Sequence, residues 1–295
     1  MLIMAIGNVT HNMVSVEGIN LFYREAGSPL NPAILLLHGF PSSSHTFRQV
    51  IRPLSEDAYV IAPDLPGFGF SDSPLPSDYT YTFENMAKSV QQLLNHLRVE
   101  RFYVYLHDFG CPVGYFLALW EPARILGLII QNGNAHMDGL DEIWKPTFEY
   151  WANPTLENKQ KISSWLHFEG TKEQYLGSLP ERFHPLISPE CWHLDWERMT
   201  RKGNIEAQWQ LFEDYKYHVE RFPLIREYHL KYQPPCIVLW GRHDPFFNVN
   251  EVLCYNEELV CCEIHVLDGG HFLLEIHDLE CVRLIRSFMK SFNDA

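Results

Sequence analysis

Three residues whose types could cooperate in nucleophilic catalysis each follow a short apolar run. Asp108 lies in YLHDFGCPVG, Asp244 in LWGRHDP and His271 in LDGGHF. A carboxylate can displace a leaving group from a saturated carbon and form an alkyl–aspartyl ester. A histidine oriented by a second carboxylate can then activate the water that cleaves this ester. The order nucleophile, acid, histidine therefore predicts a catalytic triad.

Each of these residues also has a simpler structural interpretation. Asp108 alone would be a helix-capping aspartate, Asp244 a turn residue before Pro245, and His271 a buried structural histidine. Asp138 is a weaker candidate for the acid. The joint occurrence of all three groups at the ends of apolar runs favours the triad over the separate structural roles.

The elements that must position the triad are predicted from apolar runs of strand length. Continuous apolar strands between helices are typical of a parallel sheet covered on both faces, whose ligand sites lie at the carboxyl ends of the strands. The predicted strands are Ala33–Leu37, Ala58–Ala62, Phe102–Leu106, Ile125–Ile130, Cys236–Trp240 and Glu263–Leu267. The predicted helices are Phe83–Leu97 with Thr82 as N-cap, Cys111–Trp120 and Leu279–Phe292.

The middle of the chain has a different composition. Residues 135–224 have no apolar strand run and contain six of the eight tryptophans. We therefore expect residues 1–134 and 225–295 to form one α/β core, with 135–224 as an inserted helical cap. The 295 residues suffice for such a core with an insertion.

Five motifs in order give the chain a clear family resemblance: HGFP at 38–41, DLPGFGFSDSP at 64–74, HDFG at 107–110, GRHDP at 241–245 and GGHF at 269–272. Over nearly its whole length the sequence resembles the α/β-hydrolase superfamily. Within it, the chain is similar to the aspartate-nucleophile branch of epoxide hydrolases and haloalkane dehalogenases. This implies the α/β-hydrolase fold, a mostly parallel doubly wound sheet with an inserted helical cap. It also implies Asp108, Asp244 and His271 as catalytic residues, with the backbone N–H groups of Phe40 and Phe109 as the oxyanion hole.

The chain departs from this family pattern at three positions. Leu106 is larger than the residue that epoxide hydrolases favour two positions before the nucleophile. Phe109 replaces the tryptophan that follows the nucleophile in most members, and Phe40 stands where dehalogenases usually carry an asparagine. Phenylalanine has no side-chain donor for a halide.

Epoxide opening needs a hydroxyl donor instead, and the resemblance implies two cap tyrosines for that role. Tyr150 and Tyr215 are the candidates, with Tyr175 and Tyr217 in reserve. Ordinary aromatic packing is the alternative role for each. We therefore expect an epoxide hydrolase. The alternatives are a haloalkane dehalogenase-like hydrolase, a cofactor-independent oxygenase, or a small-molecule receptor on the same fold.

The bulk composition restricts the partners. With 23 Lys and Arg against 37 Asp and Glu, the net charge of −14 disfavours binding to nucleic acid or anionic membrane. The seven cysteines lack zinc-type spacing and predict reduced thiols in a cytoplasmic protein, and the run MLIMAIG lacks the basic flank of a signal peptide. We expect no cofactor and no metal, a small-molecule substrate with water, and a monomer or homodimer.

Overall fold

Six apolar runs form adjacent strands of one sheet in the computed structural model, which describes residues 7–293. These strands pair in parallel. The complete eight-stranded order is β1-β2-β4-β3-β5-β6-β7-β8. The parallel strands are β3 (Ala33–Leu37), β4 (Tyr59–Pro63), β5 (Phe102–His107), β6 (Ile125–Gln131), β7 (Cys236–Gly241) and β8 (Cys262–Leu267). The predicted mostly parallel α/β sheet is thereby confirmed.

Two further strands at one edge are not among the predicted elements. β1 (Thr10–Val16) and β2 (Ile19–Ala26) form an antiparallel hairpin, and β2 pairs antiparallel with β4. Their side chains alternate between buried and exposed, as expected of an edge hairpin with one face toward solvent. The run of residues 1–6 that bears on targeting lies outside the described residues.

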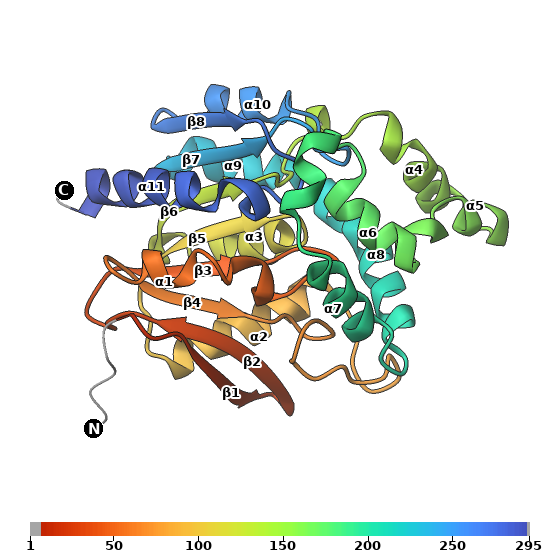
Figure 1. Ribbon diagram of the computed structural model, residues 1–295, viewed down its shortest axis with the longest axis horizontal. Coiled ribbons are helices and arrows are strands. Elements are labelled where there is room, and N and C mark those ends of the chain that lie inside the picture. The colour runs from red at the N-terminus through yellow and green to blue at the C-terminus, as the bar shows by residue number, and fades with distance from the viewer. Residues whose placement is uncertain (1–6, 294–295) are drawn as a thin grey trace.

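Helices cover both faces of the sheet (Figure 1). The side chains of β5 alternate between two apolar clusters: Val104 and Leu106 pack on one face, Tyr103 and Tyr105 on the other. The first face carries α2 (Phe83–His96), α3 (Gly110–Trp120), α9 (Phe222–Tyr232) and α10 (Glu251–Glu258), and the second carries α1 (Ile51–Leu54) and α11 (Leu274–Asn293). Thr82 caps α2 by accepting a hydrogen bond from the Asn85 N–H at 3.2 Å, as the sequence predicts.

The described chain between β6 and α9 is helical and lies beyond the carboxyl ends of the strands (Figure 1). Before α9 it forms α4 (Lys145–Ala152), α5 (Leu156–Lys161), α6 (Phe168–Leu176), α7 (Glu190–Met199) and α8 (Asn204–Glu220). Short 3-10 helices are η1 (Ser44–Phe47), η2 (Pro122–Arg124), η3 (Met137–Gly139), η4 (Glu142–Trp144), η5 (Ser163–Leu166) and η6 (Glu181–Leu186). We call residues 135–224 the helical insertion, with the boundaries predicted from the sequence.

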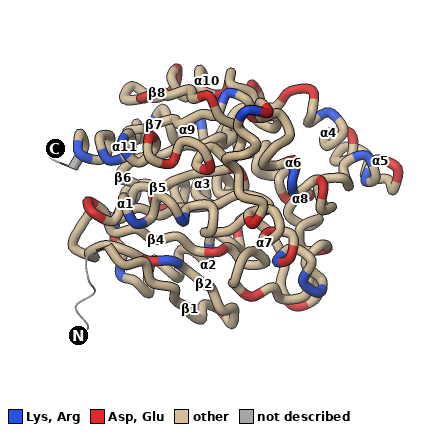
Figure 2. The backbone as a smooth tube through the Cα atoms, in the orientation of Figure 1, with Lys and Arg blue, Asp and Glu red and all other residues tan. Residues whose placement is uncertain are grey.

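Charged residues are spread over the described chain, and none of its helices is both long and strongly apolar. Lys and Arg lie dispersed over many elements and alternate with acidic residues (Figure 2). Within residues 7–293, none of the helices combines the length and the apolarity needed to span a bilayer.

Candidate active site

Asp108 occupies a sharp turn between β5 and α3, the strand-to-helix turn that the HDFG motif predicts. Its φ of +49° places a non-glycine residue in the left-handed region. Two glycines leave room for this turn: Gly110, at the start of α3, and Gly39, in the loop after β3. A Cβ at Gly110 would lie 2.4 Å from the carbonyl oxygen of Leu37, and a Cβ at Gly39 would lie 2.3 Å from the Asp108 Cβ. Close packing around the turn therefore holds Asp108 in its left-handed backbone conformation.

The large side chain of Leu106, unusual for this motif, is accommodated by a glycine on α3. A Cβ at Gly114 would lie 2.1 Å from the Leu106 Cδ2 atom. Leu106 is fully buried, so its side chain occupies the space that a Gly114 side chain would otherwise fill. The absence of a side chain at Gly114 on α3 thus makes room for the large side chain of Leu106.

The two carboxylate oxygens of Asp108 have different environments. Oδ1 accepts a hydrogen bond from the Phe40 N–H at 2.6 Å, while Oδ2 lies 3.9 Å from Nε2 of His271. Burial raises the pKa of Asp108, and the His271 charge together with the N–H groups of Phe40 and Phe109 opposes that rise. Oδ2 is therefore the carboxylate oxygen that faces His271.

The ring of His271 is held by Asp244, and both carboxylate oxygens of Asp244 accept further hydrogen bonds. The Nδ1 atom of His271 lies 2.8 Å from Asp244 Oδ2. Asn132 donates from Nδ2 to the same oxygen at 2.8 Å. The N–H groups of Phe246 and Phe247 donate to Asp244 Oδ1 at 2.7 and 3.2 Å. These donors hold the Asp244 carboxylate in place, and it in turn keeps the imidazole of His271 in one orientation.

Asn132 is a positioning residue that the sequence analysis does not identify. It follows β6 with a φ of +41°, accepts from the Gly241 N–H at 2.8 Å and donates to the Gly241 carbonyl at 3.1 Å. It therefore ties the end of β6 to the end of β7 and to Asp244. Its position at the carboxyl end of a predicted strand, beside the segment that bears the acid, was the available signal.

The remaining nitrogen of His271 faces the nucleophile. Nε2 is buried and has no hydrogen-bond partner among the described residues. Burial lowers the pKa of His271, but the charge and hydrogen bond of Asp244 and the charge of Asp108 outweigh burial, and the net shift is upward. This nitrogen is thus placed to exchange a proton with a small group near Asp108.

Aromatic rings surround the nucleophile on the side of the helical insertion. Phe40 and Phe109 lie 5.7 Å apart between ring centroids, and each contacts Phe212 of α8 at 5.2 and 5.6 Å. The two positions where dehalogenases carry halide donors therefore present phenyl rings.

Tyr215, also on α8, lies beside this cluster. Its ring centroid is 5.8 Å from that of Phe109 and 5.2 Å from that of Trp144. Its hydroxyl is buried with no hydrogen-bond partner among the described residues. Burial raises the pKa of Tyr215 well above its usual value, and the charge of Asp108 adds to the rise. Tyr215 therefore keeps its proton near the nucleophile.

The structure places the other candidate residues differently. The Tyr150 hydroxyl donates to Glu213 Oε1 at 2.5 Å, and the Tyr175 hydroxyl donates to Asp195 Oδ2 at 2.5 Å. Tyr217 is 51% exposed. Asp138, the weaker acid candidate, lines a separate cleft with His136 and Glu258. Among these four candidate tyrosines, Tyr215 is thus the one whose hydroxyl is buried and unengaged and whose ring lies beside Phe109, the residue next to Asp108.

A cleft of about 400 Å³ lies between η5, α6 and the loop after β7, and its lining includes Trp165 and Phe246. A larger cleft of about 1130 Å³ lies at the amino ends of the strands, near Ala33 and Tyr59. None of Asp108, Asp244 and His271 lines either cleft. The smaller cleft is the nearer of the two to these residues, because the Phe246 ring centroid lies 5.1 Å from that of His271.

Comparisons with known proteins agree with this geometry. Residues 32–278 match the family described as alpha/beta hydrolase fold. The chain is 36% identical over 280 residues to "Uncharacterized hydrolase YNR064C" of Saccharomyces cerevisiae, covering 90% of this chain and 92% of the yeast protein. It is 35% identical over 122 residues to "Epoxide hydrolase 2" of Siraitia grosvenorii, covering 41% of this chain and 38% of the plant protein.

A solved structure shows the same fold. The haloalkane dehalogenase DbeA-M1 loop variant from Bradyrhizobium elkanii superposes with a TM-score of 0.79 at 20% identity, covering 97% of this chain and 98% of that one. At this identity the likeness is one of fold. Because the family match spans most of the chain, this protein belongs to the alpha/beta hydrolase family and is a hydrolase similar to its epoxide hydrolase and haloalkane dehalogenase members.

Proposed function

We propose that the protein is an epoxide hydrolase that acts on small apolar epoxides through a covalent ester on Asp108. One observation carries the choice of substrate class. The groups around Asp108 offer an unengaged tyrosine hydroxyl, that of Tyr215, while Phe40 and Phe109 present phenyl rings. An alkoxide leaving group needs a proton donor, whereas a halide needs N–H donors at the positions those phenyl rings occupy.

In the first step, Oδ2 of Asp108 attacks an epoxide carbon, and that carbon's bond to the ring oxygen breaks. The Tyr215 hydroxyl gives its proton to the leaving oxygen. This produces a hydroxyalkyl ester of Asp108 and a tyrosinate. The tyrosinate regains a proton from water before the next turnover. The apolar rings of Phe109 and Phe212 exclude bulk water from the attacked carbon.

In the second step, a water molecule attacks the carboxyl carbon of the ester while Nε2 of His271 takes one of its protons. Negative charge develops on Oδ1, which the N–H groups of Phe40 and Phe109 stabilise. Collapse of this intermediate breaks the bond between the carboxyl carbon and the alkyl oxygen. The imidazolium returns its proton to that oxygen, and the diol leaves. Asp108 is left as the carboxylic acid and releases its proton to solvent, which balances the proton that Tyr215 took from water.

Ester formation itself prepares the histidine for this step. The negative charge of Asp108 contributes to raising the pKa of His271. Alkylation removes that charge, so the pKa of His271 falls in the ester intermediate. A larger fraction of His271 is therefore neutral, the form that can accept a water proton, at the stage that needs it. Asp244, whose Oδ2 lies 2.8 Å from Nδ1 of His271, holds the resulting imidazolium in place.

A single turnover in ¹⁸O-labelled water tests the covalent route. Wild-type enzyme in excess is mixed with an aryl epoxide, and both the diol and the peptide containing Asp108 are analysed by mass spectrometry. Attack of water on the ester predicts label in the carboxylate of Asp108 and none in the first diol formed. Label in the first diol would mean direct attack of water on the epoxide. Release of bromide from a bromoalkane, without conversion of the epoxide, would instead favour the dehalogenase alternative.

A further inference from the structure

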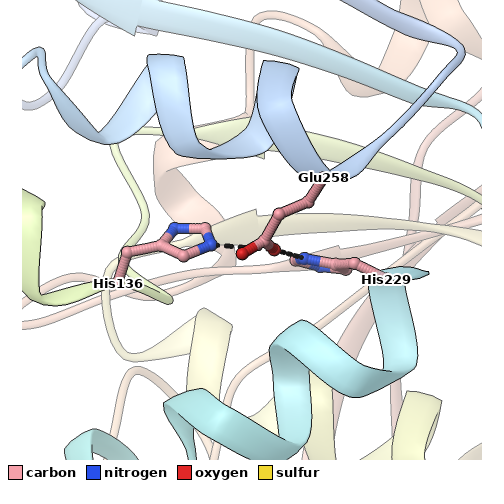
Figure 3. A group of neighbouring side chains, drawn as sticks. All are labelled: His136, His229 and Glu258. Atoms are coloured by element: carbon pink, nitrogen blue, oxygen red, sulfur yellow. Dashed lines mark hydrogen bonds and ion pairs between the residues drawn. The ribbon is translucent and has the colours of Figure 1, made fainter.

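A second group of buried titratable residues lies away from the triad, where the chain leaves the core and where it returns. His136 lies just after β6, His229 is on α9, and Glu258 ends α10 (Figure 3). Nε2 of His136 lies 3.0 Å from Glu258 Oε2, and Nδ1 of His229 lies 2.8 Å from the same oxygen. The potential ligand atoms all lie within 4.8 Å of one another.

The other ring nitrogen of each histidine is held by an oxygen. Nδ1 of His136 lies 2.9 Å from Glu251 Oε1, and Nε2 of His229 lies 3.1 Å from the Tyr115 hydroxyl. Metal-binding histidines typically have such a partner, since it fixes the ring and increases the basicity of the nitrogen that binds the metal. The two imidazoles are thus already oriented as metal ligands. The nitrogens that would bind the ion, Nε2 of His136 and Nδ1 of His229, both point toward Glu258 Oε2.

The two oxygens of Glu258 have separate roles. Oε2 faces the two histidines, while Oε1 lies 3.2 Å from Nε of Arg226, whose side chain is 62% exposed. Ligand atoms of one tetrahedral zinc ion lie about 3.3 Å apart. The two contacts to Oε2, at 3.0 and 2.8 Å, lie within a few tenths of an ångström of this spacing. The two imidazole nitrogens, which lie within 4.8 Å of each other, would move closer together when an ion binds.

A cleft connects this group with solvent. It has a volume of about 640 Å³, and both His136 and Glu258 line it. Its other charged lining residues are Asp138, Glu220, Arg226 and Glu257. The acidic groups attract a cation, and the open side leaves room for a water molecule as a further ligand.

We propose that His136, His229 and Glu258 form a binding site for a divalent transition-metal ion, Zn²⁺ being the probe that fits two imidazoles and a carboxylate. The ion would join the two connections of the helical insertion to α10 and so stabilise the base of the insertion. The three residues are far apart in the sequence, which explains why no metal site is predicted from spacing. The site is independent of the proposed epoxide chemistry.

Titration calorimetry of the metal-free protein with Zn²⁺ tests the proposal. We expect one ion per chain and a higher Tm. His229→Gln and Glu258→Gln should each weaken binding by at least about 100-fold, and Tyr115→Phe by about 10-fold. The control is His265→Gln, which removes a half-exposed histidine paired with Glu263 elsewhere on the surface.

Two results would overturn the proposal: no stoichiometric binding to the wild-type protein, or binding that His229→Gln and Glu258→Gln leave intact. Circular dichroism checks that the variants fold. If neither variant folds, the absorption spectrum of Co²⁺ bound to the wild-type protein still decides the question. A site of nitrogen and oxygen ligands gives d–d bands without thiolate charge transfer. A thiolate band would place the ion on cysteine and contradict the assignment.

Discussion

Replacing Tyr215 by Phe removes one oxygen atom, and we expect opposite effects on activity and on stability. If the hydroxyl donates to the leaving alkoxide, its loss should slow ester formation by about 10²–10³-fold, the usual effect of removing one transition-state donor. The hydroxyl has no partner among the described residues, so the folded protein loses no internal hydrogen bond. The free energy of unfolding should stay constant or rise by up to about 1–3 kcal/mol.

Two neighbouring tyrosines provide matched controls. Tyr150→Phe breaks a hydrogen bond to Glu213 and should lower the free energy of unfolding by about 1 kcal/mol. The rate of ester formation in Tyr150→Phe also shows whether Tyr150, the other candidate donor, leaves Glu213 and donates to the substrate. Tyr217→Phe alters a side chain that is 51% exposed, so its free energy of unfolding should change by less than about 0.5 kcal/mol.

The assay is a rapid-quench single turnover with an aryl epoxide, in which intact mass follows the ester and chromatography follows the diol. Tyr215→Phe should slow the appearance of the ester and leave its hydrolysis unchanged. Urea unfolding measures stability. Ester formation at the wild-type rate in Tyr215→Phe would refute the role of this hydroxyl, whatever the stability result.

Three further predictions concern the histidine, its support and the turn. Hydrolysis of the ester should slow as pH falls through the pKa of His271 in the ester, which lies below that of the free enzyme because the charge of Asp108 is gone. Asp244→Asn should move the midpoint to lower pH, as shown by the decay rate of the ester in a pH series. Asn132→Ala should lower the free energy of unfolding by about 1–3 kcal/mol, because the Gly241 N–H loses its partner, and an unchanged urea midpoint would contradict this. Gly114→Ala should cost about 1–3 kcal/mol through its clash with Leu106, and Leu106→Ala in the same chain should restore part of the loss in a thermal melt.

The fold follows from the sequence wherever strands are buried on both faces. Ala33–Leu37 and Phe102–His107 are continuous apolar runs, so their strands are predicted within about a residue. The hairpin of β1 and β2 has one half-exposed face and a mixed apolar pattern, which escapes a search for continuous runs.

The candidate site is predictable to the extent that it depends on local motifs. Asp108, Asp244 and His271 each follow a strand and can be read from the chain. The contact of Asn132 with Asp244 depends on how neighbouring strands align. The difference between the hydroxyls of Tyr150 and Tyr215 depends on packing between α4 and α8, and no local pattern encodes it.

The most direct test of the covalent aspartyl ester is the mass of a trapped intermediate. His271→Gln removes the base, so the ester should form and persist. The variant is exposed separately to an aryl epoxide and to a bromoalkane, and peptide mapping locates any adduct. Our account predicts an added mass equal to the whole epoxide, on Asp108, and no alkyl adduct from the bromoalkane. An adduct on another residue, or none from the epoxide, would contradict it.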